Sequence, residues 1–143
     1  MRQNLRRTSG ALTVLLVALF GLPLAAAAED YSKSPQAAAY QASLKAIASG
    51  DFEAYKKSVT KEARAGIEKD MKDMGMDSKK GMEMLKAMAP SDVKYTALKV
   101  DGKKATLSAT GKAMDEPAYG TIELAEEDGA WKVGKQSWTN KKP

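Results

Sequence analysis

Between residues 34 and 90, apolar residues recur every three or four positions, the spacing that places them on one face of a helix. Ala37, Tyr40, Leu44 and Ile47 show this spacing first. The ends of the helices are marked by residues with a capping role, because Ser, Thr and Asp accept free backbone N–H groups and Gly adopts a left-handed cap. The pattern predicts four helices: one from Ser34-Pro35 to Gly50, one opened by Asp51, one from Thr60 to Gly75, and one from Asp77 or Ser78 to near Pro90.

From residue 91 the period changes to two, the alternation typical of a strand with one buried face. Four such segments follow before Trp138. Tight hairpin turns are predicted at Asp101-Gly102 and Asp128-Gly129, since such turns need positive φ angles. A longer turn is predicted around residues 115–117. The order of the segments predicts an α+β fold in which N-terminal helices pack on one face of a curved four-stranded antiparallel sheet.

The first 28 residues have the organisation of a secretory signal peptide. Three arginines lie among the first seven residues, an apolar run extends from Ala11 to Leu22, and four alanines precede Glu29. The apolar run is shorter than the ~20 residues of a membrane-spanning helix. We therefore expect a periplasmic or secreted protein that loses residues 1–28, keeps a single domain over residues 29–143, and is not stably inserted in a membrane.

Composition removes several classes of function. Cleavage before Glu29 removes three arginines and no acidic residue, so the net charge falls from +5 to +2 and nucleic acid is not expected as a partner. The chain contains no histidine and no cysteine, which excludes histidine metal sites, Ser-His and Cys-His nucleophile pairs, and disulfides. A core of apolar residues must then stabilise the exported domain by itself.

Three stretches of the chain carry a resemblance to a known group. Residues 48–55 (ASGDFEAY), 100–107 (VDGKKATL) and 124–133 (LAEEDGAWKV) resemble the cystatin-like roll shared by nuclear-transport-factor-2-like domains, above all its small exported bacterial branch. Enzymes of that group are expected to hold Asp/His pairs, Tyr/Asp dyads or Asp-Arg-Asp sets inside the roll. This chain lacks histidine, and Arg64, the one arginine after residue 28, falls on a predicted exposed helix face. The departures predict that the protein is not an enzyme.

A methionine cluster is the most unusual local feature of the sequence. One hypothesis is a thioether site for Cu(I), because soft sulfur ligands suit this ion. The alternative is core filling, since methionine adapts to irregular gaps. Helical spacing places Met71, Met74, Met84 and Met88 inward and Met76 against Met71, which leaves Met82 without a packing role. The cluster consists of Met71, Met74, Met76, Met82, Met84 and Met88.

Aromatic residues provide the second candidate site. In a roll they either form an ordinary core or shape a pocket for a small apolar ligand. The candidate ligand-binding residues are Phe52, Tyr55, Tyr95, Tyr119 and Trp131.

The resulting hypothesis is a binding or interaction module of the cell envelope that needs no cofactor. Its expected partners are a small apolar ligand, an envelope protein or a second copy of the chain. Two alternatives stay open: a Met-rich Cu(I)-binding protein and, with less support, a roll-fold enzyme.

Overall fold

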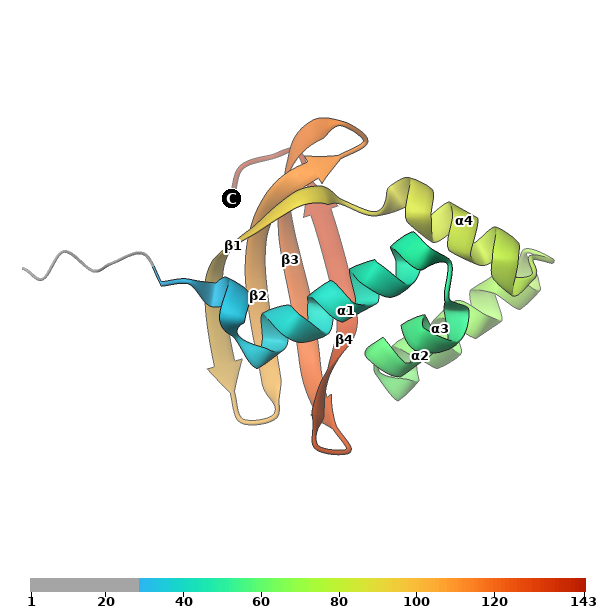
Figure 1. Cartoon of the computed structure of the whole chain (residues 1–143), viewed down its shortest axis with the longest axis horizontal. Helices are drawn as coiled ribbons and strands as arrows, with labels where there is room; N and C mark the ends of the chain where they lie inside the picture. Colours follow the sequence, from blue (N-terminus) through green and yellow to red (C-terminus); the bar gives the residue numbers. More distant parts are fainter. Residues whose placement is uncertain (1–28) are drawn as a thin grey trace, which may run out of the picture.

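The computed structural model describes residues 29–143, so the predicted signal peptide lies outside the described residues. Helices come first and strands follow, which confirms the α+β fold (Figure 1). A short 3₁₀ helix, Tyr31–Lys33, precedes α1 (Pro35–Ser49), α2 (Phe52–Ser58), α3 (Lys61–Asp73) and α4 (Ser78–Met88). The strands are β1 (Ser91–Asp101), β2 (Lys104–Ala113), β3 (Glu116–Glu127) and β4 (Ala130–Thr139).

The predicted helix caps are confirmed. The Ser34 hydroxyl accepts the N–H of Ala37 at 3.1 Å, and equivalent side-chain bonds open the other three helices. Gly50 and Gly75 follow α1 and α3 with φ angles of 71° and 63°, where a side chain would be strained. The four residues that cap the helix starts are Ser34, Asp51, Thr60 and Asp77.

The sheet is an antiparallel meander in the order β1-β2-β3-β4. Asp128-Gly129 forms the predicted hairpin turn, with both φ angles positive. The β1–β2 turn lies one residue later than expected, at Gly102-Lys103, because Asp101 still pairs with Lys104. The longer turn expected at residues 115–117 is wrong: Glu116 already pairs with Ala113, so the turn is only Met114-Asp115.

The tight Met114-Asp115 turn gives a first testable prediction. Met114 has a φ of 53° and is 81% exposed, so the strain of its left-handed backbone is not offset by packing. We expect Met114→Gly to raise the free energy of unfolding by about 0.5–1 kcal/mol, as measured by urea denaturation. Met114→Leu keeps the strained backbone and should leave stability unchanged. A loss of stability in Met114→Gly would contradict this account.

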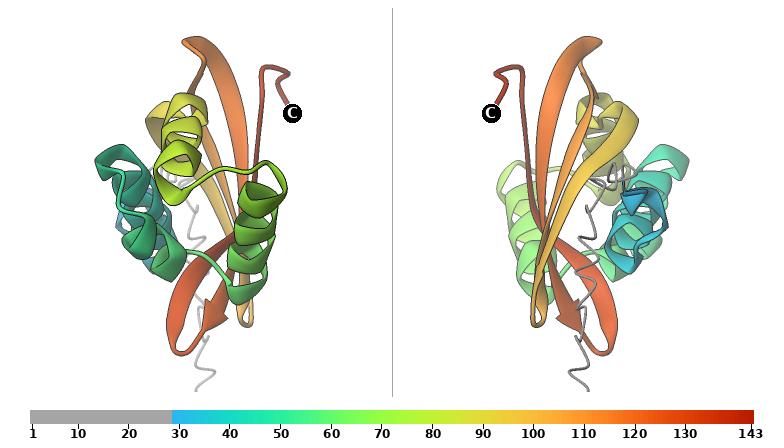
Figure 2. Two further views of the ribbon diagram at one scale, coloured as in Figure 1. Left: turned by 90° about the vertical axis from the view of Figure 1, so that its right-hand side faces the viewer. Right: turned by 90° about the vertical axis from the view of Figure 1, so that its left-hand side faces the viewer.

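Alternation along the strands separates the two faces of the sheet. Ala105, Leu107 and Ala109 of β2 are buried, as are Ile122 and Leu124 of β3, and these residues share one face through their pairing register. Helix α1 crosses this face, and α2 and α4 pack beside it (Figures 1 and 2). The hydrophobic core lies between α1 and the sheet.

Helix α3 departs from the expected arrangement, because it lies on the other side of the sheet from α1 (Figure 2). The expectation that all helices share one face is therefore wrong for α3. The segment before it crosses the β4 edge, where the Thr60 N–H donates to the Val133 carbonyl at 2.9 Å. Beyond the edge, the Glu127 carboxylate accepts the Lys61 N–H at the start of α3. These two hydrogen bonds hold the segment between α2 and α3 at the β4 edge, where the chain passes from one side of the sheet to the other.

Candidate functional site

The interior of the roll is filled by side chains. Tyr40, Leu107 and Ile122 are fully buried between α1 and the sheet. The Trp138 ring covers the backbone at Gly120, where an added Cβ atom would lie 2.7 Å from the ring. A pocket for a small ligand inside the roll would need the space that these side chains occupy.

A hydrogen-bond network joins α1 to the C-terminal half of β4 and closes the roll between them. The Tyr40 hydroxyl donates to Gln136 Oε1 at 2.7 Å and accepts from Trp138 Nε1 at 3.2 Å. The Tyr95 ring meets the Tyr40 ring edge-on at 6.5 Å between centroids. Burial raises the pKa of Tyr40 well above its ordinary value, so its phenol stays a proton donor. Tyr40, Tyr95 and Trp138 of this network belong to the hydrophobic core or pack against it.

Buried tyrosines predict a loss of stability at high pH. Burial raises the pKa of Tyr40, Tyr55 and Tyr95 in the folded chain. Above pH ~10 the unfolded chain releases phenol protons that the folded chain retains, so the free energy of unfolding falls by up to ~1.4 kcal/mol per pH unit for Tyr40. Urea denaturation between pH 8 and 11.5 measures this slope. Tyr40→Phe should have a lower free energy of unfolding at pH 8, and that free energy should fall less steeply as the pH rises. An identical slope in the two proteins would contradict this account.

The five candidate aromatic residues do not come together. Tyr55 is buried beside β4, and Tyr95 packs on Tyr40. Trp131 pairs with Glu126 near the β3–β4 turn, at the far end of β4 from Trp138. Tyr119 pairs with Thr110 and lies on the face opposite the core. Phe52 is the one that borders a surface pocket described below.

The methionines are dispersed as well. Met71 and Met82 are buried, whereas Met74 and Met88 are each 54% exposed, so the inward placement of these last two is wrong. Met82, expected to lack a packing role, is 2% exposed and belongs to the core. The reason is the phase of α4, which turns Gly81 and Met82 inward.

The cap that follows α3 forms through the backbone of Met76. The Met76 N–H donates to the Met71 carbonyl at 2.8 Å, closing the cap around Gly75. Met71 itself packs on Gly81 of α4, where an added Cβ atom would lie 2.5 Å from Met71 Cε. Met84 and Met76 are half-buried.

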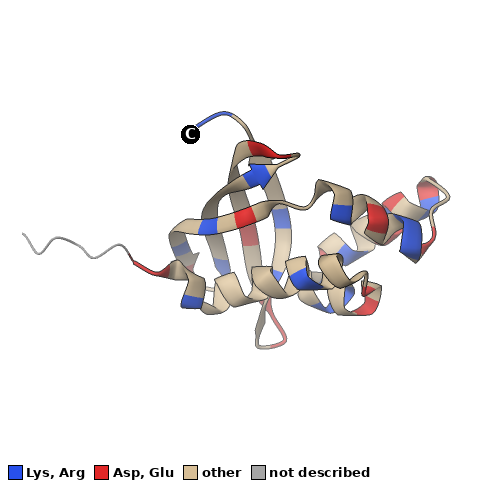
Figure 3. Cartoon of the chain, turned by 45° about the horizontal axis from the view of Figure 1, so that its top comes forward, with Lys and Arg blue, Asp and Glu red and all other residues tan. Residues whose placement is uncertain are grey.

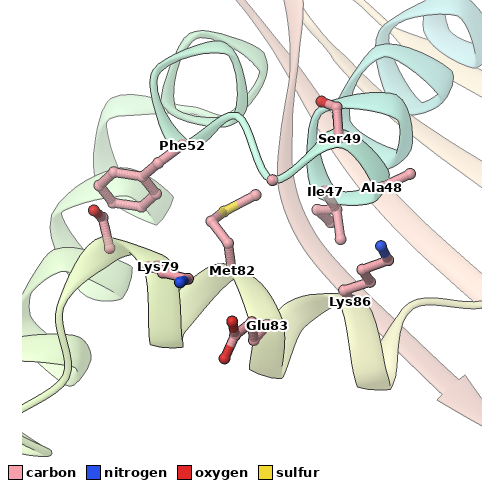
Figure 4. A pocket seen from close by; sticks show the side chains of 10 residues that line it. Ile47, Ala48, Ser49, Phe52, Lys79, Met82, Glu83 and Lys86 are labelled. Atoms are coloured by element: carbon pink, nitrogen blue, oxygen red, sulfur yellow. The ribbon is translucent and has the colours of Figure 1, made fainter.

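A surface pocket lies between the end of α1 and one side of α4 (Figure 4). Its volume is about 370 Å³. Ile47, Phe52 and Met82 form an apolar floor, and the Met82 thioether extends between the other two side chains (Figure 4). Lys79 and Lys86 lie on α4 on either side of Met82. We call these five residues the α1–α4 pocket.

The pocket combines apolar side chains with exposed charged side chains. The Phe52 ring is in contact with Lys56, whose ammonium lies 5.0 Å from the ring centroid. Lys56 in turn pairs with Glu53 at 2.7 Å. Glu83 is the carboxylate that lines the pocket beside the two lysines, which leaves a positive balance.

The sequence predictions included Phe52, as an aromatic ligand-binding residue, and Met82, as part of the methionine cluster, but they did not place the two together and missed both lysines. Lys79 is next to Lys80 in the sequence, and such lysine pairs are typical of solvated segments. The available signal is the spacing of Lys79, Met82, Glu83 and Lys86, which are i, i+3, i+4 and i+7 on one helix face. Ile47 could not be joined to them by spacing, since it lies on another helix.

Residues 29–143 were compared with the side-chain groupings that bind metal ions and with the helices that cross membranes. Within residues 29–143, no three His, Cys, Asp or Glu side chains are grouped so as to hold a metal ion. Over the same residues, no helix has the length and apolar character needed to cross a bilayer.

Comparison of the chain with protein-family models, curated proteins and solved structures finds no match. The resemblance to nuclear-transport-factor-2-like domains therefore stays a prediction.

Proposed function

We propose that this protein is an exported, non-catalytic binding module whose α1–α4 pocket takes a small amphipathic anion, such as a carboxylate with a short hydrocarbon chain. The observation that carries the proposal is an apolar floor of Ile47, Phe52 and Met82 placed between the ammonium groups of Lys79 and Lys86. Export rests on the signal-peptide organisation of residues 1–28.

The size of the pocket favours a small ligand. Its 370 Å³ lies near the lower end of the ~300–1,000 Å³ typical of ligand sites. The hydrocarbon part would cover the floor, and the anionic end would reach one of the two lysines. A ligand of about ten non-hydrogen atoms at ~0.4 kcal/mol each gives a dissociation constant on the order of 1 mM.

The roll interior favours this site over a ligand held inside the sheet. Tyr40 and Trp138 occupy that space, and the Tyr40 hydroxyl accepts the ring N–H of Trp138 and donates to Gln136. A partner bound through a broad apolar sheet face is not favoured either, since the open face carries polar side chains at Thr121, Ser137 and Thr139.

The Cu(I) hypothesis has less support than the anion. Met82 supplies one thioether to the pocket, whereas Met74 and Met88 are exposed and Met71 packs on Gly81. A Cu(I) site would need several sulfur donors around one ion. Met82→Leu separates the two ideas, because it retains the apolar floor and removes the sulfur.

Calorimetric titration tests the proposal with octanoate as ligand and 1-octanol as its neutral counterpart. We expect octanoate to bind, and Lys79→Gln with Lys86→Gln to weaken binding about tenfold or more, as the loss of roughly 1.4 kcal/mol of charge interaction implies. Lys45→Gln with Lys141→Gln removes the same charge elsewhere and should leave binding unchanged. Met82→Leu should also bind octanoate.

Two results would reject this function. One is the absence of octanoate binding up to 20-fold above the expected constant of ~1 mM. The other is equal weakening by the pocket pair and by the control pair, which would indicate general attraction to a cationic protein rather than a site.

A further inference from the structure

The sheet face opposite α1 has an unusual composition. Buried residues alternate with outward residues along β2 and β3, and the pairing register continues the outward face onto β4. The pairing register aligns them in two neighbouring rows, Thr110-Tyr119-Thr139 and Ser108-Thr121-Ser137. Every position of these rows bears a hydroxyl group. We call these six residues the hydroxyl face: Ser108, Thr110, Tyr119, Thr121, Ser137 and Thr139.

Lysines flank the hydroxyl face. Lys94 pairs with Thr110 and Lys99 with Thr106, which places both on this side of the sheet, and Lys135 follows in the next row of β4. All three are exposed, and none forms an ion pair within residues 29–143. Glu123 is the carboxylate that shares the row of Lys135. The face therefore carries a modest positive charge.

A cleft continues this surface under α3. It has a volume of about 620 Å³, and Thr106, Glu123 and Lys135 form its sheet side. Ala63 and Gly66 form its helix side, and a Cβ atom added to Gly66 would meet no other atom within 4 Å. The small residues leave the gap between α3 and the sheet open. The carboxylates of Glu62, Glu123 and Glu127 line this cleft against two lysines, Lys104 and Lys135, so an anionic chain would lie along the hydroxyl face and not inside the cleft.

The hydroxyl groups of this face are suited to a polymer that itself carries many hydroxyl groups. Short hydroxyl side chains both donate and accept hydrogen bonds, and they lose little rotamer entropy on binding. Strands ~4.8 Å apart repeat these groups at about the length of one pyranose unit in an extended glycan. The Tyr119 ring offers an apolar surface to the face of a sugar. A glycan, which presents hydroxyls along its whole length, matches this array.

The distribution of charged residues indicates which kind of polymer this face would bind. Lysine and arginine residues are interspersed with acidic residues along the helices and strands of residues 29–143 (Figure 3). A nucleic acid or a strongly anionic bilayer would require a dense basic surface. Three lysines beside a hydroxyl array instead fit a polymer with one carboxylate per sugar. We propose that the hydroxyl face, flanked by these three lysines, binds a strand of acidic polysaccharide.

The test uses the purified protein with polygalacturonate, and fully methyl-esterified polygalacturonate as the uncharged counterpart. Calorimetry should show binding of the acid and about tenfold weaker binding of the ester, the ratio expected when roughly 1.4 kcal/mol of charge interaction is lost. Thr121→Val with Ser137→Ala removes two hydroxyls at constant charge, and it should weaken binding of both polymers about tenfold. If that variant unfolds by circular dichroism, Ser137→Ala with Thr139→Ala replaces it.

Matched charge variants complete the design. Lys94→Gln with Lys99→Gln should weaken binding of the acid and leave binding of the ester unchanged. Lys45→Gln with Lys80→Gln, on α1 and α4 at the other side of the sheet, should change neither. Equal loss in both lysine pairs, no loss in the hydroxyl variant, or no binding at all would overturn the proposal. So would light scattering that shows a dimer closed over this face, dissociated by Thr121→Arg. Octanoate binding at the α1–α4 pocket, on the other side of the sheet, is a separate readout.

Discussion

Trp138→Ala is expected to lower the free energy of unfolding by about 3–5 kcal/mol, the range for removal of a large aromatic side chain from a core. Trp138 covers Gly120 and donates its ring N–H to the Tyr40 hydroxyl. Its removal leaves a void in the closed end of the roll and takes one partner from a buried phenol. For a domain of this size that is a large part of total stability.

Urea denaturation at pH 7 measures the change. Trp138→Phe keeps most of the apolar contact and should lose less than Trp138→Ala. Tyr119→Ala, on the hydroxyl face, removes an aromatic ring outside the core and should cost under ~1 kcal/mol. A cost for Trp138→Ala no greater than for Tyr119→Ala would show that the roll is not closed in the way described.

Gly120→Ala should also destabilise the protein, by about 1–3 kcal/mol, because the added methyl group overlaps the Trp138 ring. The backbone of Gly120 does not have a positive φ, so the effect comes from this contact alone. The same ring lies close to Gly111 of β2, where an added Cβ atom would be 3.3 Å from it, so it is a rigid neighbour and not the end of a flexible side chain. Thermal or urea denaturation of the single variant gives the magnitude.

A double-mutant cycle assigns the cause. Gly120→Ala should cost less in a Trp138→Phe background, where the smaller ring leaves room for a methyl group, so the two changes should be non-additive. Gly134→Ala is the matched control in the sheet, since its nearest neighbour is the Glu123 carbonyl at 3.4 Å, an ordinary contact. Additive costs in the cycle, or equal costs at Gly120 and Gly134, would contradict the proposed overlap.

The closed roll also explains how two binding surfaces can be assigned outside it. Tyr40 and Trp138 fill the interior, whereas the α1–α4 pocket and the side of the sheet opposite α1 are open to solvent. The small anion would then bind at the helices on one side of the sheet, and the polysaccharide would bind to the opposite side. Variants in either site leave the Trp138 contact intact, so stability and binding can be measured independently.

The sequence alone determined the local features of this fold. Ser34, Asp51, Thr60 and Asp77 begin helices because each side chain reaches an N–H three residues ahead, and the Asp128-Gly129 turn depends on its own φ angles. The order of helices and strands follows from the change of hydrophobic period at residue 91. Each of these signals acts within a few residues of the chain, where sequence spacing is also spatial proximity.

Only the tertiary structure decided which surfaces face one another. The path of α3 depends on Thr60 meeting Val133, and the inward turn of Met82 depends on where α4 meets α1. Helical period gave α4 an apolar face but not its rotation, since Met84 and Met82 satisfy spacing about equally well. The α1–α4 pocket and the closed roll arise from contacts between residues 30 to 98 positions apart, and no local pattern encodes such a contact.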